Sequence, residues 1–280
     1  MPKLTLSETE LAYEVAGTGE PVLLIQGVGA AGSAWKPQVE GLSFGCRMAS
    51  FDNRGLRNSN PCRGPIRIEA MAEDAAALMD ALGWESAHVV GHSMGGVIAQ
   101  ELALNHRRRV RSLALLCTFS RGRDAARVTP WVLWMSLRTR VGTRRLRRNA
   151  FLDMLLPRAV LAKADRGVLA REYGDLLGRD LADSPPVLMK QVRALAGHDA
   201  SGRLAELAGV PTLVLSGDQD PIAKPAYGRD LARRIPGATF ELFTETSHGL
   251  PIHRAWQTNE RLRLFWGSLP VGNGASGQGR

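Results

Sequence analysis

The sequence predicts an α/β protein in which a mostly parallel sheet carries helices on both faces. Short apolar runs with β character alternate with amphipathic segments of helical spacing along most of the 280 residues, which is typical of strand–helix–strand units. Several of the apolar runs are continuous, as expected for parallel strands that are buried on both faces. With 44% hydrophobic residues, the chain has enough apolar surface to form one large core.

The first half of the chain begins with residues 4–16, whose alternating polarity predicts an antiparallel pair at the edge of the sheet. A continuous apolar run at 21–25 then predicts a central strand. The glycine-rich turn after this strand allows backbone N–H groups to approach whatever lies at the strand end. The other elements expected in this half are helices at 35–42 and 68–82 and strands at 46–51, 87–90 and 110–117.

Residues 119–197 interrupt the alternation, because they contain helical patterns rich in arginine and leucine but no convincing strand. We interpret this block as an inserted helical cap. Alternation resumes with a strand at 210–215, a helix at 226–235, a strand at 239–243 and a helix at 255–266. The predicted organisation is therefore a core of residues 1–118 and 198–270, a cap of residues 119–197, and a disordered tail of residues 271–280.

The most informative motif is Gly-His-Ser-Met-Gly-Gly at residues 91–96, which lies between a β-rich run and an amphipathic run. This context is the one that a nucleophile elbow requires, because the serine lies on a sharp turn from strand to helix. The residues two before and two after the serine must then be small, and both are glycine. We expect Ser93 to project over the carboxyl edge of the sheet.

Ligands of parallel α/β sheets bind beyond the carboxyl ends of the strands. Four segments of this chain are predicted to end there. They are residues 26–29, Ser93, Asp220 and His248. We therefore expect these segments, which are far apart in the sequence, to meet at one edge of the sheet.

These motifs resemble those of the α/β-hydrolase fold superfamily over nearly all of residues 10–268. The matching segments are the motif at 91–96, the glycine-rich turn at 27–29, Asp-x-Arg-Gly at 52–55, Gly-x-x-Asp-Pro at 217–221 and Ser-His-Gly at 247–249. The order of nucleophile, acid and histidine is also that of the superfamily. The resemblance implies an eight-stranded, mostly parallel sheet with the cap inserted after the sixth strand. Within the superfamily, the cap is similar to those of small esterases, enol-lactonases and carbon–carbon bond hydrolases.

The chemistry expected of this site is that of a catalytic triad. A serine hydroxyl needs a base within hydrogen-bond reach, so His248 is expected to take the proton of Ser93 and return it to the leaving group. Asp220 is expected to hold the imidazole in the useful tautomer. We assign the oxyanion hole to the backbone N–H groups of Val28 and Met94. The substrate-binding residues are predicted to be Gly27, Trp35, Trp131 and Trp134.

Some assignments have competitors, and the motifs depart from the family pattern at positions 26 and 57, the latter being Arg57 where a second glycine is common. Asp218 is an alternative to Asp220, which the resemblance favours because it directly precedes the proline. We interpret Asp52 and Arg54 as a structural pair that braces the loops. The histidine that usually precedes the glycine-rich turn is Gln26 in this sequence, and we expect its amide to hold the oxyanion loop by hydrogen bonds to neighbouring backbone.

The leading functional prediction is a cofactor-independent serine hydrolase that acts on a small carboxylic ester, lactone or thioester. The same triad suits a carbon–carbon bond hydrolase or a perhydrolase, and a ligand receptor on the same fold is the alternative from another class. A serine at position 93 argues against the halide and epoxide chemistry that uses a carboxylate nucleophile in this superfamily.

The partner is expected to be a small-molecule substrate, with no metal or cofactor. The net charge of +9 comes largely from arginines at 107–109 and 121–148, which we interpret as solvated helix faces, with a basic rim for an acidic substrate as the alternative. Nucleic acid is not expected, because no aromatic residues are interleaved for stacking. The sequence lacks an evident signal peptide, membrane span or disulfide framework, so we expect a cytoplasmic protein. Oligomeric state is not predicted.

Overall fold

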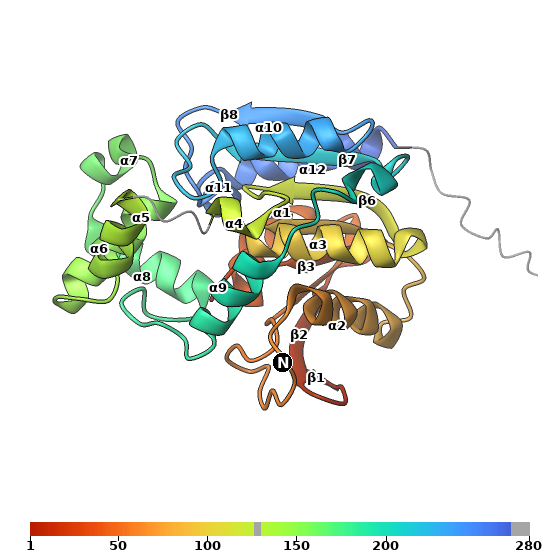
Figure 1. The fold of residues 1–280 in the computed structure, drawn as a ribbon, viewed down its shortest axis with the longest axis horizontal. Helices are drawn as coiled ribbons and strands as arrows, with labels where there is room; N and C mark the ends of the chain where they lie inside the picture. Colours follow the sequence, from red (N-terminus) through yellow and green to blue (C-terminus); the bar gives the residue numbers. More distant parts are fainter. Residues whose placement is uncertain (126–129, 270–280) are drawn as a thin grey trace, which may run out of the picture.

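The computed structural model describes residues 1–125 and 130–269, which fold around one eight-stranded sheet (Figure 1). The strand order is β1-β2-β4-β3-β5-β6-β7-β8. Antiparallel pairing is confined to the β1–β2 and β2–β4 pairs, and the other neighbours are parallel. The predicted eight-stranded, mostly parallel sheet is confirmed. Its strands are β1 (Lys3–Thr5), β2 (Glu10–Ala16), β3 (Glu20–Ile25), β4 (Cys46–Phe51), β5 (Ala87–His92), β6 (Val110–Leu116), β7 (Thr212–Gly217) and β8 (Thr239–Phe243).

The helices outside the insertion pack on the sheet, with α2 against α3 and α1 against α12. Figure 1 shows α3 and α10 in front of the sheet and α12 behind it. On α2, the apolar spacing noted in the sequence places Met71, Leu78 and Met79 in the core with no exposed surface. These elements are η1 (Gly32–Trp35), α1 (Lys36–Leu42), α2 (Ile68–Ala81), α3 (Met94–Asn105), η2 (Arg107–Arg109), η3 (Leu204–Leu207), α10 (Pro225–Arg234), α11 (Leu250–His253) and α12 (Ala255–Gly267).

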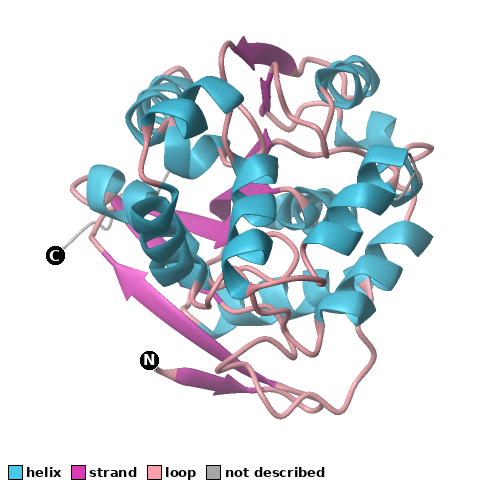
Figure 2. Ribbon diagram, turned by 90° about the vertical axis from the view of Figure 1, so that its left-hand side faces the viewer, coloured by secondary structure: helices cyan, strands magenta, loops and turns pink. Residues whose placement is uncertain are grey.

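Between β6 and β7 the described residues form six α-helices in addition to η3, and these α-helices lie beside the carboxyl ends of the strands. Figure 2, viewed from this side, shows helices in front of the sheet. Part of the insertion has a hydrophobic cluster of its own, which includes Leu152, Leu156, Tyr173 and Leu177 and is joined by Ala30 from the core. The helices are α4 (Gly122–Ala125), α5 (Pro130–Arg138), α6 (Arg144–Leu155), α7 (Arg158–Lys163), α8 (Arg166–Leu177) and α9 (Leu188–Gly197). We call α5–α9 the cap helices. The tail predicted at 271–280 lies outside the described residues.

The predicted pairing of Asp52 with Arg54 is wrong. The guanidinium of Arg54 instead binds the carboxylate of Asp74 on α2 through two hydrogen bonds of 2.6 Å. Asp52 accepts a hydrogen bond from the backbone N–H of Gly32 at 2.9 Å. Arg54 and Asp74 are both buried, and a buried charge needs a close partner of opposite sign. Neighbouring positions in the sequence did not reveal that partner, because it comes from a helix twenty residues further along.

Candidate active site

Ser93 lies in the turn between β5 and α3, with a positive φ of 56°. Such a conformation is strained for a residue with a side chain and persists only where the surroundings enforce it. Here the Ser93 N–H donates to the carbonyl of Leu116 at 3.0 Å, and the Thr118 hydroxyl donates to the Ser93 carbonyl at 2.7 Å. A Cβ at Gly95 would lie 2.0 Å from the Ile25 carbonyl oxygen, so only glycine fits there.

The structure brings Ser93, His248 and Asp220 together in one hydrogen-bonded row. His248 Nε2 lies 3.0 Å from Ser93 Oγ, and His248 Nδ1 lies 2.7 Å from Asp220 Oδ2. The three residues are 7%, 5% and 3% exposed, respectively. Asp220 follows β7, and His248 precedes α11, so the row is assembled from three separate strand ends. The arrangement allows a proton to pass from the hydroxyl to the imidazole.

The carboxylate of Asp220 is held in its charged form. Its second oxygen, Oδ1, accepts hydrogen bonds of 2.8 Å from the backbone N–H groups of Ile222 and Ala223. Burial raises the pKa of Asp220, but the charge and hydrogen bond of His248 and the two N–H groups lower that pKa, with a net shift below the ordinary value. The competitor Asp218 accepts from the backbone N–H of Thr246 at 3.0 Å instead. Its contact braces the loop that carries His248.

The glycine-rich turn lies directly beside the serine. A Cβ at Gly27 would lie 3.0 Å from Ser93 Cβ and 3.5 Å from Ser93 Oγ, so the backbone of this turn approaches the hydroxyl closely. Within residues 1–125 and 130–269, the N–H groups of Val28 and Met94 have no hydrogen-bond acceptor. Free backbone donors of this kind suit a developing oxyanion.

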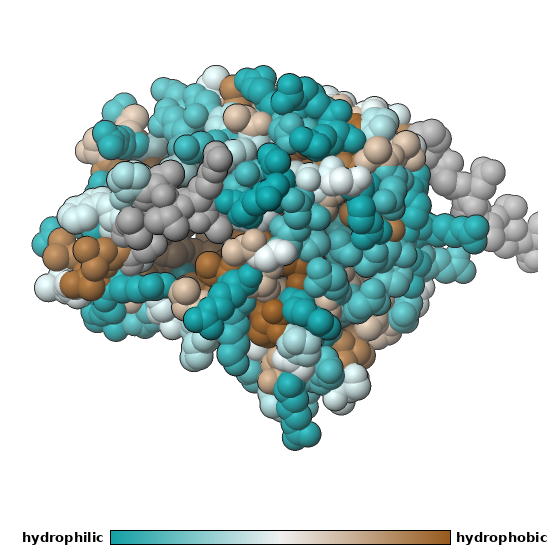
Figure 3. All heavy atoms as spheres, viewed as in Figure 1, coloured by the Kyte–Doolittle hydropathy of each residue, from teal (hydrophilic) through white to brown (hydrophobic). Residues whose placement is uncertain are grey.

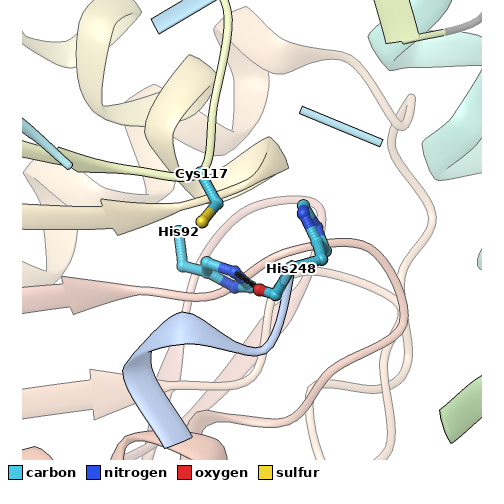
Figure 4. A group of neighbouring side chains, drawn as sticks. All are labelled: His92, Cys117 and His248. Atoms are coloured by element: carbon cyan, nitrogen blue, oxygen red, sulfur yellow. Dashed lines mark hydrogen bonds between the residues drawn. The ribbon is translucent and has the colours of Figure 1, made fainter. Parts of the chain in front are cut away.

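Gln26 holds the turn in place of the usual histidine. Its amide oxygen accepts from the Gly27 N–H at 2.8 Å, and its backbone carbonyl accepts from the Asn53 amide at 2.9 Å. The Gln26 amide oxygen also lies 2.8 Å from His92 Nδ1, while His92 Nε2 lies 2.9 Å from the carbonyl oxygen of His248 (Figure 4). Burial and the nearby charge of His248 lower the pKa of His92 to about 3, so the ring is neutral and carries a single N–H. Because both facing atoms are acceptor oxygens, the ring donates a hydrogen bond to one of these two segments and packs against the other.

This role of His92 is not predictable from the sequence, where position 92 is distinguished only by flanking the serine. The contact is made across the sheet edge, from the end of β5 to residues 26 and 248. A histidine directly before the nucleophile was the available signal, but its partners depend on how three loops meet in space.

A cluster of His92, Cys117 and His248 raises the question of a metal site (Figure 4). Their potential ligand atoms all lie within 4.8 Å of one another. However, burial and the carboxylate of Asp220 raise the pKa of the Cys117 thiol far above its ordinary value, and only a thiolate is a good ligand. Both ring nitrogens of His248 already contact Asp220 and Ser93. In this arrangement the imidazole of His248 is engaged in the hydrogen-bonded row that joins Ser93 to Asp220.

A cavity of about 540 Å³ opens above the serine, between the sheet edge and the cap helices. Figure 3 shows hydrophobic residues around the hollow on this side of the molecule. Trp131, Gly27 and Val28 line it, as do several apolar residues that the sequence did not single out for the pocket, among them Phe119, Phe151, Met154, Leu188 and Ile222.

The predicted pocket role of two other tryptophans is not supported. Trp35 is fully buried in the main core, where its ring meets the edge of His92 at a centroid distance of 6.5 Å. Trp134 is 57% exposed on α5. Neither residue is among those that line the cavity. Apolar spacing predicts that a side chain is on a helix face, but the direction of that face depends on how the helix packs.

Fold and geometry together define a class, namely an α/β protein with a nucleophile elbow beneath a helical insertion. A profile of the alpha/beta hydrolase fold family matches residues 20–254. The putative carbamate hydrolase RutD of Azorhizobium caulinodans is 30% identical over 273 residues, which cover 96% of this chain and 99% of that protein. The crystal structure of the enol-lactonase from Burkholderia xenovorans is 29% identical with a TM-score of 0.80, over 95% of this chain and 100% of that chain. The structure of the putative non-heme bromoperoxidase BpoC from Mycobacterium tuberculosis is 28% identical with a TM-score of 0.80, over 93% and 97% of the two chains.

The chain belongs to the α/β-hydrolase family, since the family profile spans well over half of its length. The family resemblance read from the motifs is confirmed, and the protein is an enzyme of the α/β-hydrolase type. Of the helices that the structure describes, none has both the length and the apolar character that crossing a membrane would require.

Proposed function

We propose that this enzyme is a serine hydrolase that cleaves a small carboxylic ester, lactone or thioester through an acyl-enzyme. The observation that carries the proposal is the row of hydrogen-bond distances from Ser93 Oγ to His248 (3.0 Å) and from His248 to Asp220 (2.7 Å). The row lies at the base of a largely apolar cavity, where the lower dielectric would strengthen the interactions of the triad and the N–H donors with the reacting carbonyl group.

In the first half-reaction, His248 accepts the hydroxyl proton as Ser93 Oγ attacks the carbonyl carbon of the substrate. The negative charge on the tetrahedral oxygen is stabilised by the N–H groups of Val28 and Met94. His248 then donates its proton to the leaving alcohol or thiol, and the ester bond breaks to leave the acyl-enzyme. Asp220 stabilises the imidazolium and fixes its tautomer through Nδ1.

In the second half-reaction, water replaces the leaving group. His248 accepts a proton from this water as its oxygen attacks the acyl carbon, and the same two N–H groups stabilise the second oxyanion. Collapse of the intermediate returns the proton to Ser93 and releases the carboxylic acid. The names of the relatives, a putative carbamate hydrolase and an enol-lactonase, support hydrolysis at a carbonyl carbon.

Perhydrolysis is a second candidate, because a structural neighbour with 28% identity is named a putative non-heme bromoperoxidase. In this reaction hydrogen peroxide takes the place of water in the attack on the acyl-enzyme, and the product is a peroxy acid. The steps up to the acyl-enzyme are unchanged.

A panel of p-nitrophenyl esters with acyl chains of increasing length tests the proposal, with hydrogen peroxide added in a parallel series. We expect ester hydrolysis by the native enzyme and loss of turnover in Ser93→Ala. Cleavage of a vinylogous diketone without any ester hydrolysis would favour the carbon–carbon bond hydrolase instead. Tight binding of a small molecule with no turnover of any substrate would favour a receptor.

A further inference from the structure

Arg179 follows α8 and contributes to the wall of the active-site cavity. Cations are unusual in such a place, because most of the lining surface is apolar and burial of a charge costs free energy unless the charge is paired. The side chain is only partly exposed, and this burial lowers the pKa of Arg179 below the ordinary value of arginine.

The contacts of the guanidinium leave one nitrogen available to a ligand. Its Nε donates to the Gly29 carbonyl at 3.1 Å, and Nη1 donates to the carbonyls of Asp180 and Asp183 at 3.3 and 2.5 Å. The Phe151 ring covers the group at 4.7 Å from its centroid, which is within the range of a cation–π contact. Among the described residues, Nη2 has no hydrogen-bond partner.

No carboxylate of the described chain forms an ion pair with Arg179. Of the acids within four residues along the chain, Asp180 and Asp183 are bound by other arginines, and Asp175 forms no ion pair with Arg179. Asp180 pairs with Arg148 and, at 2.7 Å, with Arg144, and Asp183 pairs with Arg144 at 2.9 Å. Arg179 therefore has neutral carbonyl partners only, in contrast to an internal arginine that is neutralised by a carboxylate.

We propose that Arg179 binds a carboxylate group of the substrate and makes the enzyme prefer anionic esters or lactones to uncharged ones. The inference rests on the proposed serine hydrolase function. The contact with Gly29 places the guanidinium close to the oxyanion loop, since Gly27 and Gly29 are two residues apart and such a segment spans at most about 7 Å. A substrate with a short chain between its carboxylate and its reacting carbonyl fits this arrangement.

Within the part of the chain that the structure describes, two other charged groups line the same cavity. Arg140 is exposed, and its Nη2 lies against the sulfur of Met189, so water screens its charge more strongly than that of Arg179. The carboxylate of Asp183 would repel an anion, but its ion pair with Arg144 offsets this charge. Of the described cations in the cavity wall, Arg179 is thus the one whose charge is least compensated, whereas Arg140 is the competing site.

The test compares substrates that differ only in charge. One series contains half-esters of dicarboxylic acids, such as monoethyl adipate, and a second contains acetate esters of ω-hydroxycarboxylic acids. Each compound is assayed beside its uncharged carboxamide counterpart. We expect a kcat/KM ratio of about 10- to 100-fold in favour of the charged member of at least one series, as for a hydrogen bond to a charged group. Equal kcat/KM values for charged and uncharged members of both series would overturn the proposal.

Variants then assign the preference to a residue. Arg179→Gln keeps a donor for the Gly29 carbonyl but removes the charge. We expect it to abolish the preference for charged esters while the ester bond of the uncharged, carboxamide-bearing compounds is still hydrolysed. Arg179→Lys keeps the charge and is expected to retain part of the preference for charged esters. Arg140→Gln removes one charge from the same cavity and is expected to keep the full ratio. If the ratio falls in Arg140→Gln and not in Arg179→Gln, the proposal is wrong.

Two controls keep these outcomes distinct. If Arg179→Gln does not fold, competitive inhibition of the native enzyme by the monoamide of adipic acid, which carries one carboxylate, and by the uncharged diamide still measures the charge preference, and Arg179→Lys tests the residue. Hydrolysis of a neutral p-nitrophenyl ester that depends on Ser93 shows that the hydrolase function holds. An enzyme that hydrolyses the neutral ester through Ser93 but does not distinguish charged from uncharged substrates would refute the proposed carboxylate site and leave the hydrolase function intact.

Discussion

The imidazole Nε2 of His92 lies 2.9 Å from the carbonyl oxygen of His248. This contact joins the residue before the nucleophile to the backbone of the general base. The opposite nitrogen of the same ring faces Gln26, whose amide oxygen accepts from the Gly27 N–H. A single neutral side chain therefore lies between the base and the oxyanion loop, and its one N–H is donated to one of the two.

The first prediction concerns this linkage. His92→Ala removes both contacts and is expected to lower kcat/KM by about 10-fold, the effect of roughly one lost hydrogen bond in a positioning network. His92→Gln keeps a donor near the Nε2 position and is expected to retain most of the activity. The measurement is steady-state hydrolysis of a neutral ester with melting curves alongside. Equal losses in the two variants would show that the ring matters for packing only.

The second prediction separates the two candidate acids. Asp220→Asn is expected to reduce kcat by about 10⁴-fold, because an amide does not stabilise the imidazolium or enforce its tautomer. Asp218→Asn preserves an oxygen that accepts from the Thr246 N–H and is expected to change kcat less than about threefold. Both variants are assayed with the same ester. A large loss in Asp218→Asn with an active Asp220→Asn would reverse the assignment.

The third prediction tests the packing of the elbow. Gly95→Ala would force a Cβ to within 2.0 Å of the Ile25 carbonyl oxygen, and we expect it to lower the free energy of unfolding by about 3 kcal/mol or more. Gly197→Ala is the matched control at the end of α9, because no atom lies within 4 Å of a Cβ there. Its effect is expected to stay within about 0.5 kcal/mol. Urea unfolding of both variants measures the difference, and a neutral Gly95→Ala would contradict the elbow geometry.

The fourth prediction is a pH dependence of stability that arises from His88. This residue is 8% exposed on β5, and burial lowers its pKa from 6.5 to about 4. Between these pH values the unfolded chain binds a proton at His88 that the folded protein does not. The effect of His88 titration on the free energy of unfolding is therefore absent above about pH 6.5, and it destabilises the folded protein as the pH falls toward 4. The loss approaches about 3 kcal/mol.

His88→Gln removes this titration while retaining a polar partner for Ser112, whose hydroxyl lies 2.8 Å from His88 Nδ1. We expect the free energy of unfolding of the variant to fall less than that of the native protein between pH 7 and pH 4.5, as measured in urea. Parallel curves for the two proteins would show that the folded state binds this proton as readily as the unfolded chain does.

Much of the fold was predictable, because the elements near the site are indicated by residues that are adjacent in the sequence. The glycines at 91 and 95 surround the serine in sequence, and the continuous apolar runs mark β3, β6 and β7. The antiparallel edge pair was also predicted, although its turn falls at residues 6–9 and the glycines at 17 and 19 lead into β3. The interrupted alternation at 119–197 predicted the cap, the resemblance placed it after the sixth strand, and the order of the strands within the sheet was not predicted.

Contacts between distant segments were not predictable in the same way. The partner of Arg54 is Asp74, and not the nearby Asp52. Among the arginines of the cap helices and their loops, nothing in the sequence distinguishes Arg179, because its special feature is that neighbouring acids are bound by other arginines. Whether Trp35 and Trp134 lie in the core, in the pocket or in solvent likewise depends on how their helices pack, which the sequence does not show.

The most direct test of the central claim is covalent labelling by a fluorophosphonate probe. Such a probe reacts with a serine whose hydroxyl is activated by an adjacent base. We expect stoichiometric labelling of the native protein with the adduct on Ser93, and none in Ser93→Ala or after denaturation. A native, folded protein that is not labelled, or one labelled equally in Ser93→Ala, would contradict the assignment of Ser93 and His248 as nucleophile and base.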